Sequence, residues 1–143
     1  MIEKMKRAMN ARRLAACVAV ALAAGGAAPV VAQDAKQILT LTKASWVAVR
    51  EYDGNDLLYF TNLLAWRCGV DRIRFSVNGE RLAPLEHEPC HEDEAAPNAL
   101  YAEDILPYLT YPLGSVQSVT VEVSFPDGSE ETGEYQRGAV LTR

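Results

Sequence analysis

The chain has 143 residues, which is enough for one small domain and too few for two ordinary domains once a targeting segment is set aside. It carries 14 lysines and arginines against 19 aspartates and glutamates, for a formal net charge of −5. Binding to nucleic acid or to an anionic membrane surface requires a basic patch that displaces counterions. The charge balance therefore disfavours both classes of partner.

The first 32 residues have the pattern of an export signal. Residues 1–13 hold five basic side chains against one acidic one, residues 14–24 are all apolar, and Val30-Val31-Ala32 places small residues at a cleavage point. We therefore expect cleavage after Ala32 and a periplasmic or secreted protein without stable membrane insertion. The alternatives are an uncleaved membrane anchor, a lipid attached to Cys17 and a twin-arginine signal.

Residues 33–143 are expected to fold as a single domain that contains two cysteines, Cys68 and Cys90. This part holds nine basic and 18 acidic residues, so its formal net charge is −9 with neutral histidines. In an oxidising compartment such a pair favours a disulfide, and closing a loop of about 22 residues stabilises a fold by about 3 kcal/mol. No Cys-x-x-Cys motif is present, which indicates a structural rather than a redox disulfide.

The N-terminal part of this domain predicts strands separated by tight turns. Residues 33–42 are expected to form a short strand or a tether, and residues 45–51 a strand that ends at the turn residues Asp53-Gly54. Residues 56–68 are apolar on both faces, which favours a buried strand and leaves a helix as the alternative.

A hairpin is predicted in the middle of the chain. Residues 72–78 alternate apolar and polar side chains and lead into Asn78-Gly79, a dipeptide typical of hairpin turns. Residues 82–85 are the expected return strand. A long acidic loop with two prolines follows at residues 87–98.

The C-terminal part begins with a predicted helical turn at residues 102–106, before Pro107. Alternating side chains predict a strand at residues 119–125, and residues 132–137 are expected to pair back onto it. Short strands, turns and one long loop together indicate an all-β domain, a small two-layer β-sandwich with an immunoglobulin-like layout.

Reactive side chains concentrate in the acidic loop, where His87, Cys90 and His91 lie among several acids. A free Cys90 and the two histidines could bind zinc or copper, but the spacing suits one metal only on a helix, and Pro89 opposes a helix. A solvated acidic loop with a structural disulfide between Cys68 and Cys90 is therefore the favoured interpretation.

A surface for a partner is predicted at Tyr108 and Tyr111, because they lie in a stiff segment between prolines and tyrosine is enriched at interfaces. The sequence assigns no catalytic residue, no cofactor and no oligomeric state. We expect a non-catalytic exported domain that binds another protein or an envelope component through loops and edge strands. The alternatives are a periplasmic zinc- or copper-binding protein that uses the His87-Cys90-His91 loop and a small hydrolase with an acidic site.

Overall fold

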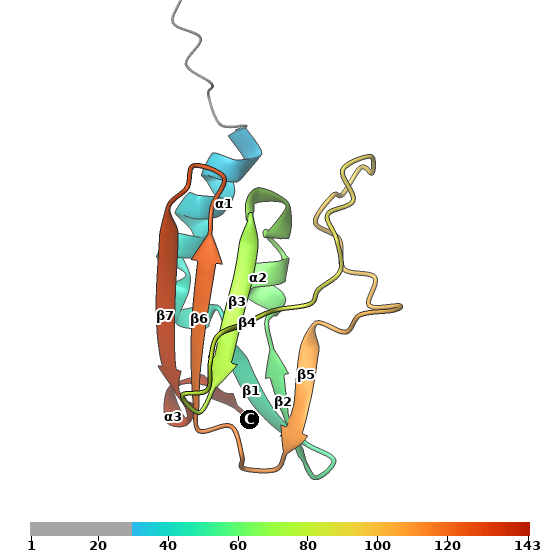
Figure 1. Cartoon of the computed structure of the whole chain (residues 1–143). Coiled ribbons are helices and arrows are strands. Elements are labelled where there is room, and N and C mark those ends of the chain that lie inside the picture. The colour runs from blue at the N-terminus through green and yellow to red at the C-terminus, as the bar shows by residue number, and fades with distance from the viewer. Residues whose placement is uncertain (1–29) are drawn as a thin grey trace, which may run out of the picture.

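A computed structural model describes residues 30–143 and shows two four-stranded β-sheets with short helices (Figure 1). Sheet A has the strand order β5-β2-β1-β8, and sheet B has the order β4-β3-β6-β7. The strands are β1 Ala48–Tyr52, β2 Asn55–Tyr59, β3 Arg72–Val77, β4 Ala83–Pro84, β5 Tyr108–Pro112, β6 Ser118–Ser124, β7 Glu130–Gln136 and β8 Leu141–Thr142. The helices are α1 Val30–Leu41, α2 Thr61–Leu64 and α3 Arg137–Val140, with 3-10 turns at Lys43–Ser45 and Arg67–Gly69.

Sheet B follows the predicted alternation most closely. Val119, Val121 and Val123 of β6 are at most 1% exposed and point to the core, while the residues between them face outward. The strand pairs antiparallel with both β3 and β7, so it is the central strand that this apolar pattern requires. Asn78 and Gly79 both have positive φ, as the predicted turn after β3 demands.

Sheet A is built around the β1–β2 hairpin, whose turn residues Asp53 and Gly54 have φ of 48° and 73°. Strand β5 pairs antiparallel with β2, and the two-residue strand β8 pairs parallel with β1. Core residues from both sheets form one hydrophobic cluster, so the all-β class expected from the sequence is confirmed.

Helix α1 ends at Leu41 and includes all but the last residue of the segment 33–42, so the prediction of a strand or tether there is wrong. Helix α1 buries Ala35 and Leu39 completely, and the Trp46 indole Nε1 donates a hydrogen bond to the carbonyl oxygen of Leu39 at 2.8 Å. The helix lies behind sheet B in Figure 1. Contact with the core, which is formed by residues distant in sequence, decides this conformation over local preference.

The segment at residues 56–68 contains both elements that the sequence left open. Strand β2 ends at Tyr59, and α2 then begins at Thr61 and buries Leu63 and Leu64. A continuous buried strand is therefore wrong beyond Tyr59. The chain changes direction at Phe60, which is 1% exposed and packs edge-on against Phe75 of sheet B.

The predicted helical turn at residues 102–106 is absent, and residues 85–107 contain no regular element. Ala102 has a φ of 55°, which is incompatible with a right-handed helix. The long acidic loop is confirmed, and Figure 1 shows it projecting from the sheets before β5.

The predicted signal peptide at residues 1–32 lies almost entirely outside the described residues. Helix α1 begins at Val30, so the predicted cleavage point after Ala32 falls in its first turn. Within residues 30–143, no helix has the length and apolar character needed to cross a bilayer.

Candidate functional site

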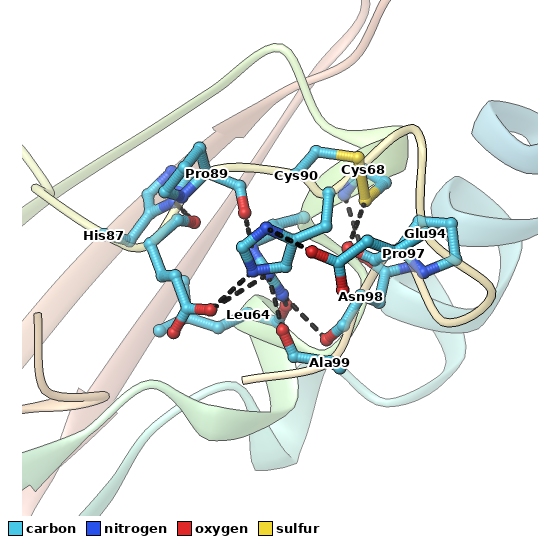
Figure 2. Close-up of a disulfide and its surroundings, with 12 residues drawn as sticks. Leu64, Cys68, His87, Pro89, Cys90, Glu94, Pro97, Asn98 and Ala99 are labelled. Carbon is cyan, nitrogen blue, oxygen red and sulfur yellow. Dashed lines mark hydrogen bonds and ion pairs between the residues drawn. A yellow bond between two sulfur atoms is a disulfide. The ribbon is translucent and has the colours of Figure 1, made fainter. Parts of the chain in front are cut away.

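The long loop is attached to the body of the protein by the predicted disulfide between Cys68 and Cys90 (Figure 2). The two Cα atoms are 5.0 Å apart, and the backbone N–H of Cys68 also donates a hydrogen bond to the Asn98 side-chain oxygen at 2.9 Å. The loop is thus held both covalently and by hydrogen bonds next to α2.

Arg67, the neighbour of Cys68, is a second attachment point. Its side chain is fully buried, and its guanidinium donates hydrogen bonds to four carbonyl oxygens. Three of these carbonyls, those of Pro89, Asn98 and Ala99, belong to the loop, at 2.7–2.9 Å. The planar guanidinium is suited to bridging several backbone acceptors. Arg67 therefore fixes both ends of the loop with polar contacts, a role that no local sequence pattern indicates.

Glu88 organises the loop from within. Its carboxylate accepts hydrogen bonds from the backbone N–H groups of Tyr101 and Ala102, and it lies 2.6 Å from His91 Nε2. The hydrogen bond with His91 and those with the two N–H groups lower the pKa of Glu88 from 4.5 to about 2. Glu88 is thus an acid of this loop that stabilises the loop's own backbone through hydrogen bonds.

The structure does not bring His87, Cys90 and His91 together as a set of ligands. Cys90 is part of the disulfide, the His87 ring contacts the backbone oxygen of Glu88 at 2.9 Å, and the His91 ring lies between Glu88 and Glu94. Among the residues that the structure describes, no group of three or more histidines, cysteines or acids is arranged to hold a metal ion. A disulfide sulfur also lacks the thiolate charge that zinc and copper prefer.

The two tyrosines predicted as a partner surface lie on opposite faces of β5. Tyr111 packs against the hydrophobic core, and burial raises its pKa. Tyr108 lies on the outer face and contacts Tyr59 of β2, with ring centroids 4.9 Å apart. Strand alternation separates the two rings, so only Tyr108 is placed where it could meet a partner.

The outer face of sheet A is the side that points away from the core, opposite Val49 and Leu58, which are both 0% exposed. Strand registers place ten residues on this face: Ala48, Arg50, Tyr52, Asn55, Leu57, Tyr59, Tyr108, Thr110, Pro112 and Thr142. Three are tyrosines, one is a cation and none is an acid. The outer face of sheet B differs, because ion pairs such as Arg72–Glu130 and Arg74–Glu122 cover it.

A hollow of about 560 Å³ opens on the outer face of sheet A, between the strands and α2. Arg50, Tyr59 and Thr142 line it from the sheet, and Thr61 and Asn62 line it from the helix. These residues come from four separate elements, and no sequence motif links them. Only the strand registers reveal that they are neighbours.

Asp56 is, like Arg67, a charged group whose side chain is fully buried. It is 0% exposed, and its carboxylate accepts hydrogen bonds from Gly114 N–H, Val116 N–H and the Arg137 guanidinium. The pairing with Arg137 lowers its pKa from 3.8 to about 2. Both oxygens are engaged, so this carboxylate holds the chain between β5 and β6 in place rather than facing a cleft.

Comparison of the chain with protein-family models, with curated proteins and with solved structures gives no match. A functional proposal for this protein therefore depends on the geometry of its own residues.

Proposed function

We propose that the protein is an exported, non-catalytic binding domain that contacts another protein or an envelope component through the outer face of sheet A. The observation that carries this proposal is the composition of that face, which presents Tyr52, Tyr59 and Tyr108 together with the exposed cation Arg50. Tyrosine and arginine are the residues most enriched at binding surfaces, because they offer large contact area together with hydrogen bonds.

The strand edges offer less to a partner than this face does. The edge strand β7 carries the exposed acids Glu130 and Glu134, and the edge strand β5 follows Pro107 and ends at Pro112. Charged side chains and prolines are common devices that keep edge strands from pairing with other chains. The face of sheet A has no comparable protection.

Export agrees with the disulfide, since such bonds persist in oxidising compartments. An immunoglobulin-like layout stays a prediction, because two packed four-stranded sheets are compatible with several sandwich topologies. The zinc or copper alternative at His87, Cys90 and His91 requires a reduced Cys90 and would need the loop to rearrange.

Site-directed photo-crosslinking in the native host tests the proposal. A crosslinking amino acid is placed at Tyr52 or at Thr110, both exposed on the outer face of sheet A. Matched controls carry it at Thr132 or Glu134, which are exposed on the outer face of sheet B. We expect both sheet A positions, and neither control, to capture the same component. Capture from both faces alike, or from neither, contradicts the proposal.

A further inference from the structure

The hollow on the outer face of sheet A is lined by apolar side chains and by several neutral hydrogen-bonding groups. Hydroxyl groups come from Ser45, Thr61, Thr142 and Tyr59, and an amide comes from Asn62. Thr142 Oγ1 donates a hydrogen bond to the carbonyl oxygen of Val49, and Asn62 Nδ2 donates one to Thr42 Oγ1, each at 3.2 Å. Within residues 34–143, the hydroxyls of Ser45, Thr61 and Tyr59 make no hydrogen bond, so they remain available to a ligand, as does the side-chain oxygen of Asn62. Pockets that recognise small molecules combine an apolar surface with a few such polar groups.

An aromatic wall accompanies these polar groups. Tyr59 lines the hollow, and its ring contacts the ring of Tyr108, with 4.9 Å between the ring centroids. A sugar ring has an apolar face that packs on an aromatic ring and a rim of hydroxyls that exchange hydrogen bonds with hydroxyl and amide side chains. The lining therefore has the chemistry that a saccharide requires.

The charge of the hollow is opposite to that of the protein. Residues 33–143 hold 18 acids and nine basic residues, yet none of the lining residues is an acid and one is Arg50. The Arg50 guanidinium lies 5.3 Å from the centroid of the Tyr52 ring, and no carboxylate of the described residues forms an ion pair with it. A guanidinium held in this way is suited to a two-pronged contact with a carboxylate.

We infer that this hollow binds a carboxylate-bearing saccharide, with Arg50 contacting the carboxylate, Tyr59 stacking on the sugar ring and Thr61, Asn62 and Ser45 bonding its hydroxyls. The inference rests on the proposed function and names the chemical class of the ligand. An acidic peptide is the alternative occupant, and binding of tri-glutamate would favour it over the saccharide.

Titration of the purified protein with tri-galacturonic acid, followed by calorimetry and by NMR shifts, tests the inference. Two further ligands serve as controls: the methyl ester of the same trisaccharide, which lacks the charges, and tri-glutamate, which has carboxylates but no sugar. At about 0.15 M salt, non-specific attraction is largely screened. We expect saturable binding of tri-galacturonic acid, with shifts at Arg50, Tyr59 and Thr61, and at least tenfold weaker binding of both controls.

Variants then assign the contacts. Arg50→Gln is expected to weaken binding of tri-galacturonic acid by about tenfold or more, and Tyr59→Ala by a similar factor. Arg81→Gln is the matched control, because Arg81 is an exposed arginine on the turn between β3 and β4 and does not line the hollow. Its affinity should equal that of the wild type.

The inference is overturned if tri-galacturonic acid does not bind, if tri-glutamate binds as tightly, or if Arg50→Gln and Arg81→Gln behave alike. These outcomes are separable from failure of the proposed function. Crosslinking of a host protein at Tyr52 and Thr110 without saccharide binding would retain a binding role for the face and reject the saccharide.

Discussion

At the residue scale, Asp56 and Arg137 show how a buried charge can specify the path of the chain. Asp56 Oδ2 lies 2.5 Å from Arg137 Nη1, and Arg137 also contacts Glu51 at 2.6 Å and the carbonyl oxygen of Val116 at 2.8 Å. Removing one member of such a buried pair is strongly destabilising, because the partner charge remains buried without compensation.

Asp56→Asn is expected to lower the free energy of unfolding at neutral pH by about 3–5 kcal/mol, measured by urea denaturation. The pKa of Asp56 is depressed from 3.8 to about 2 in the folded protein. Its ionised form therefore contributes stability above about pH 4, and this contribution is lost as the pH falls toward 2. In Asp56→Asn, the free energy of unfolding should no longer contain this contribution from Asp56, so its fall between about pH 4 and pH 2 should be smaller than in the wild type.

The exposed residue Asp53 in the β1–β2 turn provides the matched control, since asparagine also tolerates its positive φ of 48°. Asp53→Asn should have the same free energy of unfolding as the wild type at neutral pH and near pH 2. Equal stability of Asp56→Asn and Asp53→Asn would show that the buried pair makes no net contribution.

Position 133 in β7 requires a glycine, because the side chain of Tyr135 lies close above it. A Cβ atom at this position would overlap with the Tyr135 hydroxyl, which itself donates a hydrogen bond to the Lys43 carbonyl oxygen at 2.6 Å. The Tyr135 ring thus lies along the strand over Gly133 and connects β7 to the 3-10 turn after α1. Glycine at this position permits that close approach.

Gly133→Ala should destabilise the protein by about 1–3 kcal/mol, because Tyr135 must leave its position to avoid the added methyl group. Gly138→Ala is the control, since a Cβ there meets no atom within 4 Å. Thermal unfolding of the two variants measures the difference. A Gly133→Ala midpoint equal to that of Gly138→Ala would contradict the assigned role of Tyr135.

At the scale of elements, local sequence patterns did not predict α1, the longest helix of the described residues. Leu39 is 0% exposed and Leu41 is 75% exposed, although both are leucines of the same helix. Leu39→Ala should lower the free energy of unfolding by about 2–5 kcal/mol, whereas Leu41→Ala should change it by less than about 0.5 kcal/mol. Urea denaturation of both variants decides whether the helix is part of the core. A flexible tether would give two small and equal effects.

The long loop depends on two attachments, the disulfide and Arg67. Replacing Cys68 and Cys90 together with serine should reduce stability by about 3 kcal/mol, because the unfolded chain gains freedom. Hydrogen exchange should become faster at residues 86–100, while the central strand β6 stays protected at short times. Chemical reduction of the wild type should reproduce the effect. An unchanged melting temperature would mean that Arg67 alone holds the loop.

At the scale of the whole molecule, the predicted signal-peptide cleavage would decide which part of α1 remains. Cleavage after Ala32 would remove the first turn and leave Ala35 and Leu39, the residues of this helix that are known to be buried. We therefore expect intact-mass and N-terminal analysis of exported protein to give a start at Gln33. A start at Met1 in the membrane fraction would contradict the prediction of a signal peptide.

Regular local patterns were enough to predict a large part of the fold. The alternation in β6, the turns at Asp53-Gly54 and Asn78-Gly79 and the pairing of Cys68 with Cys90 are all found as expected. Each of these features depends on residues close in sequence or, for the disulfide, on there being only two cysteines after the predicted signal.

What the sequence alone determined is the all-β class, the tight turns and the disulfide, because side-chain periodicity and turn residues act locally. Tertiary structure alone decided that α1 is helical, that residues 108–112 form a strand paired with β2, and that Arg50, Tyr59 and Thr61 surround one hollow. These outcomes depend on strand register and on contacts between residues far apart in the chain, and neither leaves a local pattern in the sequence.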